Sequence, residues 1–312
     1  MIINSHVHVN TSGNFFYYPE YDLQEFLAEM QENRISIAFP ALNPKVDIFR
    51  CPNEETQHLS SEKPICTATH ERAKLQHRVA VFSSDNQLIL QCKTCGKVIT
   101  KTSIDPLRVH NKELIMLTKP YRSALKPLLY LLLSKLTMQQ EIDFWENNYP
   151  NSFVGFKLHP WNDQVSVADF RLHASKPFLI HTGIRELESA KNAIAFAKNN
   201  PNLKVVLAHA AALDENALQE ISLLDNVWID CCPSTFMYEN RFSAFAFPQD
   251  ITSPADIYYK VLDYLPSSKV LFGTDSPWGN SRQELAVIQQ LQVPKSVKAQ
   301  ILYRNACEVY GL

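Results

Sequence analysis

Residues 177–183 read PFLIHTG, a short apolar run that ends in a histidine and a glycine. The pattern recurs in VVLAHAA at 205–211 and in VLFGTDSPW at 270–278, where a histidine or an aspartate follows the apolar residues. Apolar runs of this length without polar alternation are typical of strands in a parallel sheet that is buried on both faces. We therefore expect strands whose ends carry chemically active side chains.

Eight apolar runs of strand length occur along the chain, and segments with apolar residues at helical spacing follow them. The strand candidates are Ile2–Val9, Ile35–Leu42, Leu114–Thr118, Phe153–His159, Phe178–His181, Lys204–His209, Val227–Cys231 and Val270–Thr274. The helical segments include Asp22–Glu32, Glu186–Asn199, Glu215–Leu224 and Ala255–Leu265. Eight strands alternating with helices predict an α/β fold of the (β/α)8 TIM-barrel type.

One polar segment, Asn43–Asn111, breaks this alternation and holds most of the cysteines and histidines in the first part of the chain. We interpret it as an insertion between the second and third strands. The predicted organisation is a barrel domain over residues 1–42 and 112–312, with a small β subdomain inserted at 43–111. A length of 312 residues suits one barrel of this type.

The charges are nearly balanced, with 30 Lys and Arg against 32 Asp and Glu. This balance argues against nucleic acid or an anionic membrane as partner and favours a small-molecule substrate. The opening MIINSHVHV does not resemble a signal peptide, and the longest apolar run, Leu128–Leu133, is too short for a membrane span. Seven cysteines, an odd number, favour reduced thiols and a cytoplasmic location. The sequence is also compatible with assembly into a homo-oligomer.

His6 and His8 lie two residues apart on the first predicted strand, so both imidazoles point to one face. Alone, such a pair also suits solvated histidines or histidines packed in a core. However, three later strands end in His181, His209 and Asp275, and barrel active sites form at the C-terminal ends of strands. A buried aspartate also needs a metal or a cationic partner. The set therefore predicts a metal site in the barrel.

The chain resembles the amidohydrolase superfamily, in the branch of metal-dependent hydrolases and aminocarboxymuconate-semialdehyde decarboxylase-like enzymes. The motifs that carry the resemblance are HVH at 6–8, GFKLHP at 155–160, IHTG at 180–183, AHAA at 208–211 and GTDSPW at 273–278. They run through nearly the whole chain outside the insertion. Each motif is short, but as an ordered set they are specific.

The resemblance implies that His6, His8, His181 and Asp275 hold the metal. It also implies that His209 is the catalytic histidine or a second ligand, and that Asp275 takes the proton from the attacking water. Imidazole and carboxylate ligands suit zinc and related divalent ions, whose bound water has a pKa of about 7. We expect zinc or another divalent metal in the barrel.

The chain departs from the family pattern at two places. Many relatives have an aspartate two residues before the first histidine, whereas this chain has Asn4. Lys157 and His159 share a face of the fourth predicted strand, where some relatives carry a carboxylated lysine that bridges two metals. We favour a buried ammonium with a catalytic role at Lys157, because a buried lysine needs a partner, and hence a single metal. His159 is then a substrate-binding candidate.

Loops after the strands overhang the predicted barrel mouth and can supply a substrate pocket. The candidates are Arg185, Tyr238, Arg241 and Trp278. The alternative for each residue is a role in loop packing.

The insertion contains CKTCGK at 92–97, a CxxC motif that follows VAVFSSDNQLILQ, the pattern of a β-hairpin. With the upstream CTATH, the four residues Cys66, His70, Cys92 and Cys95 have the spacing of a tetrahedral structural zinc site and resemble a zinc ribbon. Metal binding would supply the folding free energy that so small a unit lacks. Substitutes for the upstream pair are Cys51, His58 and His77, and the alternative is a redox-active or incidental CxxC.

Three functions follow, in order of preference. The first is hydrolysis of a carbonyl, amide or lactone by a metal-activated water, with Asp275 as base and His209 polarising or protonating. The second is non-oxidative decarboxylation, in which Arg185 or Arg241 would hold the substrate carboxylate. The third is a non-catalytic binding or adaptor protein that works through the zinc ribbon.

Overall fold

The computed structural model describes residues 1–9, 21–42, 79–84, 87–240, 248 and 250–312. Eight parallel strands form one sheet in the order β1-β2-β6-β7-β8-β9-β10-β11. They are β1 (Ile3–His8), β2 (Ile37–Ala41), β6 (Leu128–Tyr130), β7 (Gly155–Leu158), β8 (Phe178–Ile180), β9 (Val205–Leu207), β10 (Val227–Asp230) and β11 (Val270–Leu271). A parallel bridge between Val7 and Ser276 joins the two edges of the sheet. The predicted TIM barrel is confirmed.

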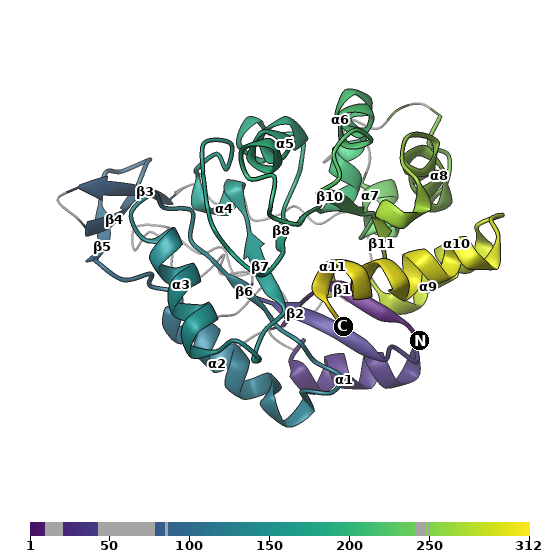
Figure 1. Ribbon diagram of the computed structural model, residues 1–312, viewed down its shortest axis with the longest axis horizontal. Helices are drawn as coiled ribbons and strands as arrows, with labels where there is room; N and C mark the ends of the chain where they lie inside the picture. The colour runs from purple at the N-terminus through teal and green to yellow at the C-terminus, as the bar shows by residue number, and fades with distance from the viewer. Residues whose placement is uncertain (10–20, 43–78, 85–86, 241–247, 249) are drawn as a thin grey trace.

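Helices surround this sheet (Figure 1). They are α1 (Leu23–Glu32), α2 (Arg108–Thr118), α3 (Met138–Asn148), α4 (Pro160–Asp163), α5 (Ala190–Asn199), α6 (Glu215–Ile221), α7 (Ser234–Glu239), α8 (Pro254–Tyr264), α9 (Ser281–Gln290), α10 (Lys295–Ala299) and α11 (Asn305–Tyr310). Short helical turns are η1 (Lys119–Tyr121), η2 (Glu186–Glu188), η3 (His209–Leu213), η4 (Ser267–Lys269) and η5 (Gln300–Arg304). The helical segments predicted from periodicity correspond to α1, η2 with α5, α6 and α8.

One strand prediction is wrong. Leu114–Thr118 lies in α2, where Leu114, Ile115 and Thr118 are buried while Met116 is 63% exposed. This spacing is helical, and a short apolar run alone does not separate a helix from a strand. The third barrel strand is instead β6, at the start of the apolar run Leu128–Leu133.

The barrel strands separate an inner core from an outer one by simple alternation. On β8, Phe178 and Ile180 pack in the cluster that includes the helices α5 and α8, whereas Leu179 packs with residues of the barrel interior. Since strand side chains alternate between faces, the residue that follows Ile180 points inward with Leu179. The same alternation on β7 places Lys157 inward, between Phe156 and Leu158 of the outer core.

A second, three-stranded antiparallel sheet lies between β2 and β6 in the sequence. It contains β3 (Val79–Ser84), β4 (Gln87–Cys92) and β5 (Val98–Thr102), and β3 with β4 forms the predicted hairpin. Leu88 and Leu90 are fully buried in one cluster with residues of α1, α2 and β6, which attaches this sheet to the barrel. Figure 1 shows the sheet at the left end of the molecule. The predicted boundary at Asn111 falls inside α2.

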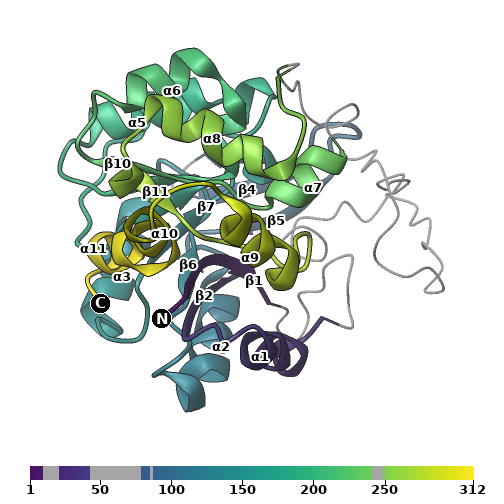
Figure 2. The same ribbon diagram turned by 90° about the vertical axis from the view of Figure 1, so that its right-hand side faces the viewer.

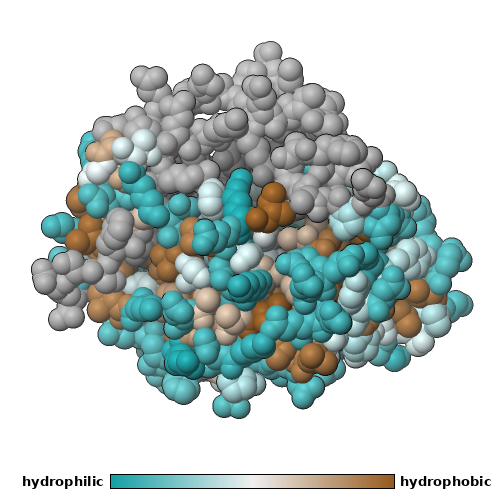
Figure 3. All heavy atoms as spheres, turned by 90° about the horizontal axis from the view of Figure 1, so that it is seen from above, coloured by the Kyte–Doolittle hydropathy of each residue, from teal (hydrophilic) through white to brown (hydrophobic). Residues whose placement is uncertain are grey.

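Both chain termini lie on the same side of the barrel (Figure 2). Tyr310 of α11 packs in the same cluster as Ile3 of β1, so the last helix covers one end of the barrel interior. On the face seen in Figure 3, hydrophilic and hydrophobic residues are interspersed over the described part of the surface. None of the described helices has the length and apolar character that crossing a membrane requires.

Asn111 offers a test of how α2 is held against the barrel. Its buried side chain accepts from the backbone N–H of Tyr130 at 3.0 Å and donates to the carbonyl of Tyr130 at 2.7 Å. We predict that Asn111→Ala lowers the free energy of unfolding in urea by roughly 2–4 kcal/mol, because each buried group left without a partner costs about 1–3 kcal/mol. The control Asn148→Ala removes an exposed hydrogen bond to Phe144 and should have a far smaller effect. Equal effects would contradict this view of Asn111.

Candidate active site

A strand irregularity brings His6 and His8 to the inner face of β1. Ile3 packs in the barrel interior, so unbroken alternation would send Val7 inward. The pairing of β1 with β2 shifts register between Asn4 and Val7, and Val7 packs outward against the α1 side. A bulge of this kind re-aims the side chains that follow it, and here both imidazoles enter the barrel.

Two further residues depend on unusual backbone geometry. His209 has a φ of 59° and begins η3, a turn in which the residues up to Leu213 all have positive φ. Asp275 has a φ of 54°. Left-handed backbone is unfavourable for residues with a Cβ, and such strain is concentrated at functional sites. In this structure the strain turns both side chains toward the cluster around His6.

The cluster centres on the carboxylate of Asp275. Its Oδ1 lies 3.2 Å from His6 Nε2 and 3.1 Å from His8 Nε2. Lys157 Nζ donates to His6 Nε2 at 2.7 Å. All four side chains are buried or nearly so. The structure therefore brings together four of the residues that the sequence predicted, from β1, β7 and the segment after β11.

Oxygen atoms on the outer side of two histidines fix their proton positions. His6 Nδ1 lies 3.0 Å from Asp230 Oδ2, and His8 Nδ1 lies 3.3 Å from the carbonyl of Ala41. These oxygens only accept, which favours a proton on Nδ1 of each neutral ring, while Asp275 Oδ1, also an acceptor, faces Nε2 of both rings. The Nε2 lone pairs then point inward, toward Asp275.

The same reasoning applies to His209 and His181. His209 Nδ1 donates to the carbonyl of Cys232 at 2.6 Å, so Nε2 carries the lone pair and faces His181 Nδ1 at 2.9 Å. On its other side, His181 Nε2 lies 3.4 Å from Glu188 Oε2. Either neutral tautomer of His181 leaves one lone pair facing another acceptor. An additional proton or a cation at this position removes the repulsion.

These contacts fit a divalent cation. Imidazole nitrogens and a carboxylate oxygen converge with their lone pairs inward, which is the donor set that zinc and manganese accept. His6, His8 and Asp275 form one group of candidate ligands whose atoms lie within 4.8 Å of one another. His181 falls in a neighbouring group with His159 and Glu188. Its membership in the first ligand set stays a prediction.

Burial keeps the histidines neutral. Removal from water is the main cause that lowers the pKa of His6, His8 and His181, and it lowers the pKa of His209 to about 4. Burial also lowers the pKa of Lys157, although the nearby Asp275 acts in the opposite direction. Metal binding requires neutral imidazoles, so this environment prepares the rings as ligands.

Two glycines permit the close approach of the residues around the cluster. A Cβ at Gly183 would lie 2.5 Å from Glu188 Oε1, and a Cβ at Gly273 would lie 2.7 Å from Cys232 Sγ. Contacts this short do not occur, so any larger residue would displace Glu188 or Cys232. The glycines of the IHTG and GTDSPW motifs are therefore needed for packing around the site.

The predicted substrate-binding residues lie at different depths. The ring of His159 stacks on His181 with centroids 3.7 Å apart, and Trp278 meets His8 edge to face at 5.4 Å. The guanidinium of Arg185 lies 4.1 Å above the ring of Trp161. Tyr238, on α7, packs against the outer core. Arg241 lies outside the described residues.

The predicted structural zinc site is described only in part. Cys92 is the last residue of β4, and Cys95 is in the turn that follows. In this turn Gly96 has a φ of 74° and donates its N–H to the carbonyl of Cys92 at 2.9 Å. Cys66 and His70 lie outside the described residues, as do Cys51, His58 and His77.

Three residues close to the cluster were not among the predicted site residues: Asp230, Cys232 and Glu188. Asp230 follows the apolar residues of β10 as the last residue of that strand, just as Asp275 follows β11, so the same signal could have identified it. Cys232 lies in the segment after β10 and Glu188 in the short helical turn η2, and no periodic pattern marks either as a site residue. Asn4, the departure from the family pattern, donates to Thr274 Oγ1 at 2.8 Å and helps to close the barrel.

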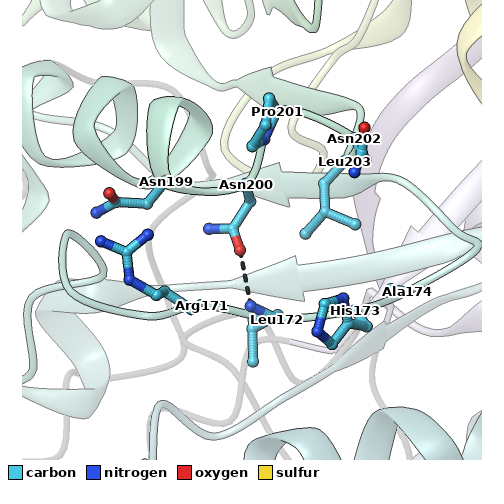
Figure 4. Close-up of a pocket in the computed structure, with 9 residues that line it drawn as sticks. All are labelled: Arg171, Leu172, His173, Ala174, Asn199, Asn200, Pro201, Asn202 and Leu203. Carbon is cyan, nitrogen blue, oxygen red and sulfur yellow. Dashed lines mark hydrogen bonds between the residues drawn. The ribbon is translucent and has the colours of Figure 1, made fainter.

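A separate pocket lies at the opposite end of the barrel, before the starts of β8 and β9. Its lining is Arg171, Leu172, His173, Ala174, Asn199, Asn200, Pro201, Asn202 and Leu203 (Figure 4). The buried Asn200 accepts from the backbone N–H of Leu172 at 2.7 Å and donates to two backbone carbonyls. The polar groups of Asn200 thus serve loop structure.

Comparison with protein families matched residues 175–312 to the family described as amidohydrolase. This segment begins just before β8 and includes His181, His209 and Asp275. The predicted resemblance to the amidohydrolase superfamily is confirmed by this match. A comparison with curated proteins found no match.

Solved structures share the fold along the whole chain. The crystal structure of 5-carboxyvanillate decarboxylase from Sphingomonas paucimobilis has 13% identity and a TM-score of 0.63, covering 100% of this chain and 99% of that chain. A dihydroxybenzoic acid decarboxylase from Polaromonas sp. JS666, with bound manganese and the inhibitor 2-nitroresorcinol, has 12% identity and a TM-score of 0.62, covering 100% and 97%. A probable 2-pyrone-4,6-dicarboxylic acid hydrolase from Acinetobacter baumannii has 13% identity and a TM-score of 0.56, covering 100% and 99%.

The lowered pKa of His209 predicts a pH dependence of stability in the metal-free protein. Between pH 6.5 and about pH 4 the unfolded chain binds a proton that the folded His209 does not, so acidification destabilises the fold by up to about 1.4 kcal/mol per pH unit. The buried carboxyls of Asp105 and Glu284, whose pKa burial raises to about 7, act in the opposite direction. The effect must therefore be measured as a difference between variants.

We predict that His209→Gln unfolds in urea with a weaker loss of stability on acidification than the wild type, measured with a chelator present. The control is His173→Gln, at an exposed position in the loop before β8. It should follow the wild-type pH dependence. Parallel curves for all three proteins would show that His209 is not held neutral.

Proposed function

We propose, on the premise of the amidohydrolase resemblance, that this protein is an enzyme, a metal-dependent hydrolase that acts on a carbonyl carbon of a small molecule. The observation that carries the proposal is the convergence of His6 Nε2 and His8 Nε2 on Asp275 Oδ1. With both ring protons on Nδ1, these three atoms are acceptors in a buried site, and a divalent cation between them would add to the single charge of Lys157 in reducing their repulsion. They lie in the last residues of β1 and just after β11, at the C-terminal ends of the strands, where active sites of this barrel architecture form.

The residues that would hold the ion are His6, His8 and Asp275, with His181 as the fourth ligand expected from the resemblance. A divalent metal at this position polarises a carbonyl and lowers the pKa of water. Zinc or manganese satisfies this donor set. The protein supplies neutral imidazoles, a fixed carboxylate and a site shielded from solvent.

Three side chains perform the remaining chemistry. Asp275 accepts the proton of the attacking water through a carboxylate oxygen, and this proton passes to the lone pair of His209 Nε2, from which it is delivered to the leaving group. The ammonium of Lys157 donates to an oxygen of the substrate. In this structure Lys157 Nζ donates to His6 Nε2, which places the ammonium beside the proposed metal ligands.

Decarboxylation is the second candidate, and the buried Lys157 is the observation that favours it. A buried ammonium is an effective partner for a substrate carboxylate. Arg185 lies at the rim, fixed between the face of Trp161 and Glu188, whose Oε1 is 3.9 Å from an Arg185 nitrogen. Its side chain is 45% exposed, which suits a role in attracting an anion rather than in the chemical step.

Isotope incorporation separates the two reactions. The purified protein, loaded with zinc or manganese, would be incubated with a panel of lactones, esters, amides and hydroxylated aromatic acids. Hydrolysis places oxygen-18 from labelled water in the acid product, whereas decarboxylation releases carbon dioxide and places deuterium from heavy water on carbon. Oxygen incorporation without carbon dioxide supports the first proposal, and the reverse result supports the second.

Asp275→Asn should lower the turnover of any substrate found by at least roughly 100-fold, because an amide cannot take the proton. His6→Ala should lower both activity and bound metal, measured by elemental analysis. The matched control Asp214→Asn changes an aspartate that caps α6 and should retain activity. Activity retained by Asp275→Asn would contradict the role of this residue as base.

We also propose that Cys92 and Cys95, with Cys66 and His70, bind a structural zinc. The support from the described residues is the turn after β4, in which the backbone folds back through Gly96. A small sheet held by metal would fold as the ion binds. A cytoplasmic location, which favours reduced thiols, and a role of this unit as an adaptor or in oligomerisation stay predictions.

Metal content tests the structural zinc. We predict about two metals per chain for the wild type and about one for the double variant with Cys92→Ser and Cys95→Ser, which should also be less stable. Cys307→Ser, on α11, is the control and should keep the wild-type content. An unchanged content in the double variant would exclude this pair as zinc ligands.

A further inference from the structure

Asp230 occupies a central position behind the histidines. It is the last residue of β10, and its side chain is completely buried. The His6 imidazole of β1 contacts one oxygen of the carboxylate, and the start of the η3 turn, which follows the neighbouring strand β9, contacts the other. None of the roles proposed above uses it.

Each oxygen of the Asp230 carboxylate has its own donors. Oδ2 lies 3.0 Å from His6 Nδ1. Oδ1 accepts from the backbone N–H of His209 at 3.0 Å, and from the backbone N–H and the thiol of Cys232, both at 3.3 Å. The residue thus accepts on both oxygens. An asparagine cannot do this, because its amide nitrogen only donates.

The contacts of His6 favour one proton arrangement, because the acceptor Asp275 Oδ1 lies 3.2 Å from Nε2 while a donor lies closer to the same nitrogen. Lys157 Nζ is a donor and lies 2.7 Å from His6 Nε2, so Nε2 carries a lone pair. The proton of the neutral ring is then on Nδ1 and points to Asp230. Two independent contacts, one on each nitrogen, agree on the same tautomer.

The second contact of Asp230 acts on His209. The backbone of His209 has a φ of 59°, an unfavourable conformation that costs roughly 1–3 kcal/mol. The hydrogen bond from its N–H to Asp230 Oδ1 holds the first residue of this strained turn. One carboxylate therefore positions a ligand on β1 and the acid–base candidate after β9.

We propose that Asp230 is a positioning residue that sets the His6 tautomer for metal binding and holds the His209 turn in register with it. This inference rests on the proposed function, because it takes His6 as a metal ligand. Outer carboxylates of this type orient ligating histidines in metal sites generally. Here the same group also couples the ligand to a second histidine.

A competing role for Asp230 is direct ligation. Asp230, His6 Nδ1 and Cys232 Sγ form a compact group in which a cation could bind. The donors on Oδ1 oppose this role, because two backbone N–H groups point to that oxygen. X-ray absorption of the metal-loaded protein decides between the roles, since a bound thiolate gives sulfur at about 2.3 Å from zinc. Sulfur at this distance that persists in the Cys92→Ser, Cys95→Ser double variant would overturn the proposal.

The main test is the affinity of the barrel for Zn²⁺ in Asp230→Asn, measured by competition with a chelator. We expect a roughly 10–100-fold weaker Kd, the usual result of removing such a partner. The matched control is Glu284→Gln, another fully buried carboxylate, which accepts from Ser234 and Thr235 and contacts no histidine among its described hydrogen bonds. It should lose stability while keeping Zn²⁺ affinity. Equal losses of Zn²⁺ affinity in both variants would mean that Asp230 has only a structural role, and this result would overturn the proposal.

If Asp230→Asn does not fold, the tautomer of His6 in the wild type provides a second test. Nitrogen-15 NMR of the metal-free protein distinguishes the histidine tautomers, and the His6 signal is assigned by its absence in His6→Gln. A proton on Nδ1 supports the proposal, and a proton on Nε2 overturns it. If the wild type shows the Nδ1 tautomer but binds no ion in the barrel, the metal assignment fails while the pairing of Asp230 with His6 stands.

Discussion

The site depends on hydrogen bonds that point away from it. Four imidazoles are buried in the barrel mouth, and acceptor oxygens lie against the outer nitrogens of three of them, from Asp230, Ala41 and Cys232. The inner nitrogens of His6 and His8 then face Asp275, and the inner nitrogen of His209 faces His181. Burying such an arrangement is unfavourable without a compensating positive charge, and Lys157 supplies only one. Under the proposed function, the ligands would be in place before an ion binds, which lowers the entropic cost of binding.

Irregular backbone geometry directs these side chains toward the site, at a cost in conformational energy. Regular strands would send every second residue inward, but the register shift in β1 and the left-handed residues His209 and Asp275 redirect the chain near the strand ends. Tight packing compensates for this strain. Gly183 and Gly273 allow Glu188 and Cys232 to approach closely, so the short motifs of the sequence combine ligands with the glycines that make room behind them.

Much of this arrangement could be predicted from the sequence, because burial on both faces gives the strands of a parallel barrel a clear apolar signature. Seven of the eight strands and the positions of His6, His8 and Asp275 follow from it. Leu114–Thr118 was assigned wrongly, because a run of four apolar residues and a threonine fits a helix as well as a strand. Asp230 ends an apolar strand and carries the same signal as Asp275, but it was not selected, and nothing in the short helical turn η2 marks the contact of Glu188 with His181. Neither reaction chemistry nor substrate could be read from the chain, since both decarboxylases and a hydrolase share this fold.

The central claim is that the inward lone pairs hold a divalent ion, and anomalous diffraction from crystals of the zinc-loaded protein tests it most directly. If the ion binds there, an anomalous peak lies about 2.0–2.2 Å from His6 Nε2, His8 Nε2 and a carboxylate oxygen of Asp275. A peak found only beside Cys92 and Cys95, with no ion among these histidines at saturating zinc, would contradict the account.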